Sequence, residues 1–124
     1  VPCSDHVLLY ATTLARWSRR GCAEAPKFVQ DYVAWGAGPR ASQNLVMGGK
    51  ARALLHGRYH VSIDDIRQTA YPVLRHRIIT NFNAEADGVG SEEIIKMLIE
   101  QVPRDPNGAI DESLAGRVFA KGDG

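Results

Sequence analysis

Residues suited to a buried face recur at intervals of three and four through most of the chain, which is the spacing of amphipathic helices. The first such segment starts at Ser4, a suitable N-cap, and ends near Arg19–Arg20, with Gly21 just beyond it. Its expected buried stripe consists of Val7, Ala11, Leu14 and Ser18, with Leu8 and Ala15 beside it. The pattern therefore predicts a first helix over about 4–20.

A short second helix is predicted to open at Pro26 and to close at Gly36 and Gly38. Its expected buried residues are Phe28, Val29, Tyr32 and Val33. Because glycine favours the end of a helix, the two glycines separate this element from the next one.

The third and longest helix is predicted to run from about Pro39 to His56 and to stop at Gly57. One of its faces holds Ala41, Leu45, Gly48, Ala51 and Leu55. A glycine inside a helix costs about 1 kcal/mol relative to alanine. The adjacent pair Gly48–Gly49 therefore indicates that another helix approaches closely at this point.

Ser62 and Asp65 mark the start of a fourth helix. Ser62 fits the N-cap position and Asp65 follows three residues later, a variant of the capping box. The apolar residues of this helix are Ile63, Ile66 and Ala70. Pro72 is expected to interrupt it, because proline lacks the N–H that the helix ladder uses. The segment PVLRHRII then forms either a second short helix or a turn leading into an extended piece.

The remaining elements are shorter. Residues 58–61, RYHV, are β-like, and residues 80–90, TNFNAEADGVG, are expected to form a loop. Ser91 caps a fifth helix that Pro103 ends, with an apolar stripe of Ile94, Ile95, Leu98 and Val102. Together the elements predict a mostly α-helical fold, a small helical bundle that leaves room for a short β pairing.

The composition is that of one globular domain. The 124 residues are 44% hydrophobic and 23% charged. A net charge of +1 gives no overall attraction to nucleic acid or to an anionic membrane, and no apolar run approaches the ~20 residues of a membrane span. Cys3 and Cys22 are too few for a disulfide scaffold and lack metal-ligand spacing, so we expect free thiols in a reducing cytoplasm.

Both ends of the chain lead to expectations about its organisation. It begins with Val1, without an initiator methionine or a signal-type segment, as a piece cut from a longer protein would. The composition changes from residue 104 onward, and we expect a loosely held tail with at most a short helix from Ile110 to Phe119. The expected division is a helical domain over 1–103 and a tail over 104–124.

Motifs of a complete enzyme are missing from the sequence. No glycine-rich phosphate loop is followed by lysine and Ser/Thr, and MGGK at 47–50 falls inside a predicted helix. The histidines do not pair at zinc-like spacing with one another or with the cysteines; they are His6, His56, His60 and His76. Helix capping explains Asp64 and Asp65. This chain alone therefore does not resemble a complete enzyme.

An arginine stands where the third predicted helix begins. Gly38 fits its N-cap, Pro39 its first position and Arg40 its second. The positive end of the helix macrodipole disfavours a cation there by about 0.3–1 kcal/mol. Such a mismatch is typical of a functional site, but a solvated arginine also tolerates it. From the residues alone, both interpretations stay open.

The order of motifs resembles a known family. The stretch 36–81, GAGPRASQNLVMGGKARALLHGRYHVSIDDIRQTAYPVLRHRIITN, is followed by AEADGVGSEEIIKMLIEQVP at 84–103. The series GxxPRAS, ALLxGRxxVxxDDI, PVLRHR and AEAxG, closed by an acidic helix ending in VP, is similar to the C-terminal lid of MoxR-type AAA+ ATPases. The resemblance covers about residues 4–103 and does not extend to the tail.

The resemblance implies a small helical subdomain that follows an α/β nucleotide-binding core. In this family the core supplies the phosphate loop and the magnesium-binding motif. The arginine of PRAS, here Arg40, resembles the sensor-2 arginine that reaches from the lid to the nucleotide phosphates, and Pro39 belongs to the same nucleotide-binding motif. The implied cofactors are ATP and Mg²⁺ in the complete protein, with none bound tightly by this segment.

The resemblance implies two kinds of partner: the AAA+ core of the same chain, and further copies that assemble into a homo-hexameric ring. The family is associated with chaperone-like remodelling of proteins, often with von Willebrand factor A domains, and with maturation of enzymes such as methanol dehydrogenase. The resemblance does not fix the roles of Arg75, His76 and Arg77, which either stabilise the lid itself or contact the core or a neighbouring subunit.

Two alternatives do not use the resemblance. A free-standing helical module could bind nucleic acid or protein through Arg40, Arg75 and Arg77, and nucleic-acid binding would weaken steeply with salt. A metal-dependent enzyme built on the four histidines would contain stoichiometric zinc.

Overall fold

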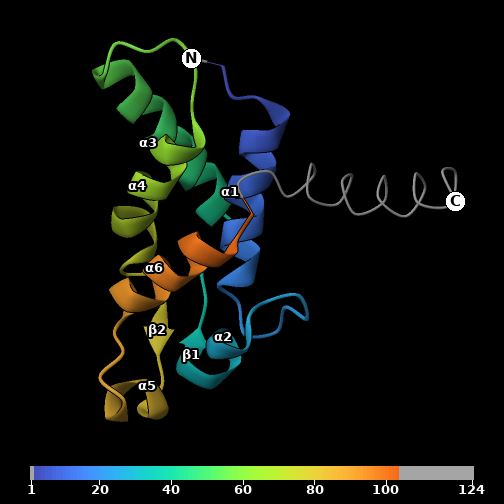
Figure 1. Cartoon of the computed structure of the whole chain (residues 1–124), viewed down its shortest axis with the longest axis vertical. Coiled ribbons are helices and arrows are strands. Elements are labelled where there is room, and N and C mark those ends of the chain that lie inside the picture. The colour runs from blue at the N-terminus through green and yellow to red at the C-terminus, as the bar shows by residue number, and fades with distance from the viewer. Residues whose placement is uncertain (1, 104–124) are drawn as a thin grey trace, which may run out of the picture.

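Six helices and a two-stranded sheet make up the part of the chain that the structure describes, residues 2–103 of a computed structural model (Figure 1). The four longer helices are α1 (Asp5–Trp17), α3 (Ala41–Leu55), α4 (Ile63–Leu74) and α6 (Ser91–Gln101). The shorter elements are α2 (Lys27–Tyr32), β1 (Val33–Trp35), β2 (Ile79–Thr80) and α5 (Phe82–Ala86). The predicted mostly helical fold is confirmed, whereas the tail predicted over 104–124, with its helix from Ile110 to Phe119, lies outside the described residues.

Helices α3 and α4 lie against each other at the two glycines of α3. A Cβ atom added to Gly48 would lie 2.3 Å from Thr69 Cγ2, and one added to Gly49 would lie 2.9 Å from Ile66 Cδ1. Both distances are shorter than the roughly 3.5–4.0 Å at which two carbon atoms pack best. The glycine pair is therefore explained by close approach of α4, as predicted.

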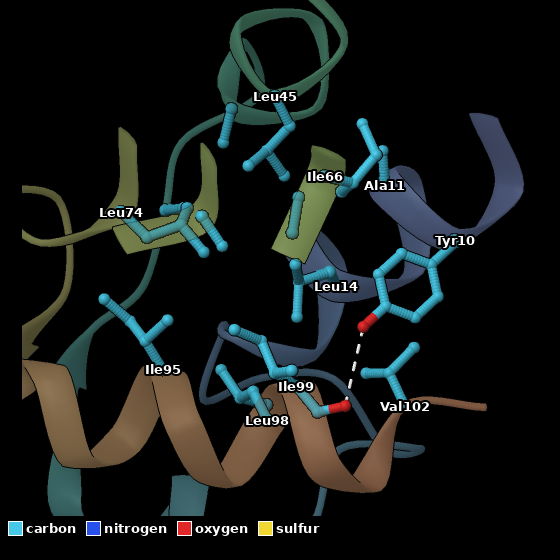
Figure 2. Close-up of a cluster of buried hydrophobic side chains, with 14 of the residues drawn as sticks. Tyr10, Ala11, Leu14, Leu45, Ile66, Leu74, Ile95, Leu98, Ile99 and Val102 are labelled. Carbon is cyan, nitrogen blue, oxygen red and sulfur yellow. Dashed lines mark hydrogen bonds between the residues drawn. The ribbon is translucent and has the colours of Figure 1, made fainter. Parts of the chain in front are cut away.

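The core lies where α1, α3, α4 and α6 meet (Figure 2). Its largest fully buried side chains include Tyr10, Leu14, Leu45, Ile66, Leu74, Ile94, Ile95 and Leu98. One polar bridge crosses its edge: Arg67 Nε donates to the Tyr10 hydroxyl at 3.1 Å, and Arg67 Nη2 donates to the Ile99 carbonyl at 3.2 Å. The Tyr10 hydroxyl also donates to the Ile99 carbonyl, at 3.5 Å. This bridge joins α1, α4 and α6.

The short β pairing forms, but between other residues than the β-like RYHV segment. Strands β1 and β2 are antiparallel, with Val33 opposite Thr80 and Trp35 opposite Ile79. Val33, predicted as helical, therefore belongs to a strand. Residues 58–61 form a loop instead, which the Val61 N–H anchors by donating to the Pro2 carbonyl at 3.1 Å. The prediction of a strand at 58–61 is wrong: in the part of the chain that the structure describes, β1 and β2 pair with each other and neither pairs with this segment.

Helix α1 ends at Trp17, earlier than predicted. The Ser18 hydroxyl donates to the Ala15 carbonyl at 2.7 Å and so satisfies one of the free carbonyls of the last turn. Arg19 leaves the helix and reaches across to the residues before α3. The helix end is thus set by a long-range contact that the local pattern does not contain.

Pro72 does not interrupt α4, which continues through it to Leu74. Proline removes the N–H that would bond to the carbonyl of Gln68, and both residues lie on the exposed side, where water can replace that bond. The Arg75 N–H still donates to the Tyr71 carbonyl at 2.9 Å. Of the two alternatives for the segment after Pro72, the structure has a turn leading into an extended piece, β2.

The buried faces match the prediction on α4 and α6 but not throughout α1 and α3. On α3, Gly49 and Ala53 follow Leu45 into the core, while Ala51 and Leu55 are exposed, Leu55 to 86%. Leu8 of α1 is 46% exposed. The side of α3 that faces inward is therefore the side on which the glycines contact α4. It is not the side that carries the largest apolar residues.

The predicted caps have three different outcomes. Ser62 caps α4 as predicted: its hydroxyl accepts from the Asp65 N–H at 3.2 Å, and Asp65 Oδ2 accepts from the Ser62 N–H at 2.9 Å. Ser4 is at the N-cap of α1, but its hydroxyl lies 3.0 Å from His6 Nδ1 and makes no cap bond. Ser91 is the first residue of α6 rather than its cap, which is Gly90.

One further helix falls in the segment predicted to be a loop. Asn81 caps α5 by accepting from the Ala84 N–H at 3.0 Å, and its side-chain amide donates to the Asp31 carbonyl at 2.8 Å. At the C-cap of this helix, Asp87 accepts a hydrogen bond from the Tyr32 hydroxyl at 2.7 Å. This hydrogen bond raises the pKa of Tyr32 above its usual value, because a phenolate would face the carboxylate.

We expect Gly48→Ala to destabilise the domain, because the added methyl group would overlap Thr69 Cγ2. Overpacking costs about 1–3 kcal/mol, and the 2.3 Å approach favours the upper end of that range. Replacing glycine by alanine in a helix returns about 1 kcal/mol through higher helix propensity. Urea unfolding should therefore show a net loss of up to about 2 kcal/mol. Adding Thr69→Ser, which removes that methyl group, should restore most of the stability, whereas a Gly48→Ala domain as stable as the wild type would contradict the close contact.

Ser62→Ala should lower the free energy of unfolding by about 1 kcal/mol, since the cap bond to the Asp65 N–H is lost. The matched control is Ser91→Ala, which removes the same hydroxyl from a first helical position that makes no cap bond. Thermal unfolding of the two variants should separate them. Equal losses in both would mean that α4 is not capped by Ser62.

Candidate functional site

Arg40 lies exposed at the start of α3, and its side chain makes no hydrogen bond or ion pair within residues 2–103. It is the N-cap residue, with φ −86° and ψ −3°, rather than the second residue of the helix as predicted. Gly38, predicted as the N-cap, lies before the helix. The exposure of Arg40 leaves its guanidinium available to a ligand or to another domain.

A tight turn accounts for the later helix start. The Gly38 carbonyl accepts a hydrogen bond from the Ala41 N–H at 3.1 Å, which encloses Pro39 and Arg40 in a four-residue turn. The backbone angles of Arg40 match the third position of a type I turn, and proline is favoured at the second. Pro39 therefore directs the chain into the turn that presents Arg40.

Within residues 2–103, no carboxylate pairs with the positive charge of Arg40. The first turn of α3 contains no acidic residue, and the Arg40 side chain makes no cap bond to the free N–H groups of that turn. The positive end of the helix macrodipole and the guanidinium therefore lie together. This pair of features fits an anion such as a phosphate group, which would be stabilised by both.

The residues before the turn are held by the end of α1. Ser18, fully buried, accepts from the Ala37 N–H at 3.1 Å. Arg19 donates from Nε to the Ala37 carbonyl at 2.8 Å and from Nη2 to the Gly38 carbonyl at 3.1 Å. A Cβ atom on Gly36 would lie 2.2 Å from the Ser18 carbonyl, so only glycine permits this approach.

A cavity of about 480 Å³ opens beside this loop. Arg19, Arg20 and Gly21 line one side of it, and residues 34–39 line the other. Trp35, at 71% exposure, contributes an accessible aromatic ring. The turn that presents Arg40 therefore adjoins a hollow lined by two arginines.

The LRHR segment is engaged within the domain. Arg75 Nε lies 2.8 Å from a carboxylate oxygen of Glu92 on α6, and Arg77, in the turn after α4, donates to the Val73 carbonyl in the last turn of that helix at 3.4 Å. His76 is exposed. Two of the three arginines that a nucleic-acid surface would use thus have partners within the described residues, which does not favour that alternative.

A buried carboxylate, which the sequence reasoning assigned only to capping, organises the other end of α3. Asp65 is fully buried; Arg58 donates to its Oδ1, and Arg52 Nε lies 3.4 Å from the same oxygen. Ser62 donates its hydroxyl to Oδ2 at 3.0 Å. Arg58 of the GR part and Asp65 of the DD part of the motif series therefore have a structural role. The spacing of Arg58 and Asp65 was a usable signal for this pair.

The histidines and cysteines show no site among the described residues. No group of three or more His, Cys, Asp or Glu residues in that part of the chain could hold a metal ion. Cys3 and Cys22 are both free thiols, and partial burial raises the pKa of Cys3 above its usual value. Nor does any helix within residues 2–103 have the length and apolar character of a membrane span.

Sequence reasoning proposed Arg40 and Pro39 as site residues but did not single out Ser18 and Arg19 as the residues that hold the loop before them. No local signal marks these two residues, because their partners Ala37 and Gly38 lie 18 or 19 positions further along the chain. Only the pair of glycines around Ala37 hinted at a close backbone approach.

Comparison with known proteins matches most of the described residues to one domain family. A family model described as an AAA lid domain matches residues 26–98, which include the turn and Arg40. "Chaperone MoxR1" of Mycobacterium tuberculosis is 35% identical over 74 residues, which cover 60% of this chain and 20% of that protein. The uncharacterized protein YeaC of Bacillus subtilis is 36% identical over 70 residues, covering 56% of this chain and 22% of that protein.

A solved structure is also similar. The crystal structure of a candidate ATPase from Cytophaga hutchinsonii matches with a TM-score of 0.73 at 33% identity, over 83% of this chain and 31% of that one. The chain thus spans about a fifth of the length of the curated relatives it matches.

Proposed function

The chain belongs to the AAA lid domain family and is a lid of the MoxR type, and we propose that Arg40 acts in it as the sensor-2 arginine in ATP binding and hydrolysis. The observation that carries the proposal is the guanidinium of Arg40. It is exposed, has no partner within the described residues and stands at a helix start without acidic neighbours.

The chemistry of arginine suits contact with a nucleotide phosphate. A guanidinium stays charged at all physiological pH values and donates two parallel hydrogen bonds to phosphate oxygens. The phosphate would supply the negative charge that the start of α3 lacks. Pro39 contributes by fixing the turn from which Arg40 projects.

The proposal divides the nucleotide site between two domains. The AAA+ core contributes the phosphate loop and the ligands of Mg²⁺, and the lid, over residues 1–103, contributes Arg40 and Pro39. ATP and Mg²⁺ are thus cofactors of the complete ATPase. When the bound nucleotide changes, the contact at Arg40 changes with it, and the lid tilts against the core.

The assembly we propose is a cytoplasmic homo-hexamer that converts this tilt into chaperone-like remodelling of partner proteins. A relative of this chain bears the name chaperone MoxR1, which supports the assignment. Proteins with von Willebrand factor A domains are the proposed clients. Maturation of a metal-cofactor enzyme, as in regulation of methanol dehydrogenase, is one process in which such remodelling would act.

The 124-residue chain by itself should bind ATP weakly. It offers one arginine and one helix start, so we expect a dissociation constant in the millimolar range or weaker, for which the binding free energy is only about −4 kcal/mol. Isothermal titration calorimetry with MgATP measures it. Micromolar binding would contradict the division of the site between lid and core.

In the ATPase that contains this lid, Arg40→Ala should reduce kcat/KM for ATP by roughly 10- to 150-fold. A charge-assisted hydrogen bond to a desolvated phosphate contributes about 1.5–3 kcal/mol, which corresponds to that factor. Arg40→Lys should recover only part of the activity, because an ammonium cannot reproduce the bidentate contact. Steady-state hydrolysis assays at varied ATP concentration measure both effects.

The matched control is Lys50→Ala, which removes an exposed cation from the same helix about 15 Å further along its axis. This variant should hydrolyse ATP like the wild type, and the lid should stay folded in all three variants. Wild-type hydrolysis by Arg40→Ala would refute the sensor-2 assignment and leave Arg40 as a solvated surface residue.

A further inference from the structure

We propose that Arg19 is a positioning residue for Arg40: it fixes the loop that presents the sensor-2 arginine without touching the nucleotide itself. This inference rests on the function proposed above for Arg40. It extends that function to a second arginine, located at the end of α1 and outside the family motif quoted for the nucleotide contact.

The two hydrogen bonds of Arg19 hold consecutive peptide groups. Its Nε donates to the Ala37 carbonyl at 2.8 Å and its Nη2 to the Gly38 carbonyl at 3.1 Å. A planar guanidinium with two bonds fixes both the position and the orientation of the peptides that it contacts. Hydrogen bonds from a charged donor are also stronger than those between neutral groups.

The Gly38 carbonyl connects this clamp to Arg40. The same oxygen accepts the Ala41 N–H at 3.1 Å and so closes the turn that contains Pro39 and Arg40. A shift of the Gly38 peptide would therefore displace the whole turn. Arg19 therefore acts on a backbone carbonyl that closes the turn from which the Arg40 side chain projects.

The loop needs such a restraint because of its composition. Gly36 and Gly38 flank Ala37, and glycine leaves a backbone with the greatest conformational freedom. Ser18 holds the N–H of Ala37, and Arg19 holds its carbonyl, so that the peptide groups on both sides of Ala37 are bound by the two residues that follow α1. The Arg40 side chain has no partner of its own within the described residues, so its position is set by the backbone of this loop and by the first turn of α3, where the Asn44 N–H donates to the Arg40 carbonyl at 3.0 Å.

A double-mutant cycle in the ATPase that contains this lid tests the inference. Arg19→Ala should lower kcat/KM for ATP by about 10- to 100-fold, the effect expected when a catalytic group is misplaced by about 1 Å. In the Arg40→Ala background, Arg19→Ala should cost no more than about 2-fold further. The second effect disappears because Arg19 acts only through Arg40.

The control is Arg16→Ala, which removes another arginine of α1, one that pairs with the exposed Glu24 at 2.8 Å. It should leave hydrolysis unchanged in both backgrounds. Arg19→Lys, which keeps the charge but reaches only one of the two carbonyls, should give an intermediate rate. This milder variant keeps the test valid if Arg19→Ala does not fold.

The outcomes separate the inference from the proposed function. Wild-type activity of Arg40→Ala would overturn the sensor-2 assignment and the inference with it. If Arg40→Ala is impaired, the sensor-2 assignment stands. The inference about Arg19 is then overturned if Arg19→Ala has no effect on kcat/KM, or if Arg19→Ala lowers kcat/KM by the same factor in the wild-type and Arg40→Ala backgrounds. Equal factors would mean that Arg19 only stabilises the lid.

Discussion

At Gly48 and Gly49, α3 presents no side chain to α4, and Thr69 and Ile66 occupy the space where Cβ atoms would stand. This contact fixes α3 against α4. Helix α4 also carries Arg67, whose guanidinium joins the Tyr10 hydroxyl of α1 to the Ile99 carbonyl of α6. Through these contacts, α1, α3 and α6 are all packed against or bonded to α4. A displacement of one of these helices is transmitted to the others, because the interior is close-packed.

Both ends of α3 are tied into that body by arginine. At its end and in the loop that follows, Arg52 and Arg58 meet the buried carboxylate of Asp65. Before its start, Arg19 holds the loop that leads into the turn of Arg40. A helix fixed at both ends can transmit a force applied at its exposed arginine. In the proposed function, the nucleotide biases the lid through contacts that differ between its bound states.

The sequence was a good guide wherever the determining contacts are local. Spacing and capping predicted the long helices, and the capping box at Ser62 and the glycine contact with a neighbouring helix were recognised from a few residues. The errors arose where distant residues decide the outcome. Helix α1 ends where Ser18 meets Ala37, and the inward side of α3 depends on α4.

The candidate site divides along the same line. Arg40 stood out as a candidate because its charge conflicts with a local rule and because it stands in a family motif. Arg19 instead acts on carbonyls 18 and 19 residues away, and the sequence offers no pattern for such a contact.

The most direct measurement of the proposed role of Arg40 is a structure of the complete ATPase with a non-hydrolysable ATP analogue. We expect the Arg40 guanidinium to lie within hydrogen-bond distance of a phosphate oxygen. A guanidinium directed into solvent, with another arginine bound to the phosphates, would contradict the sensor-2 assignment.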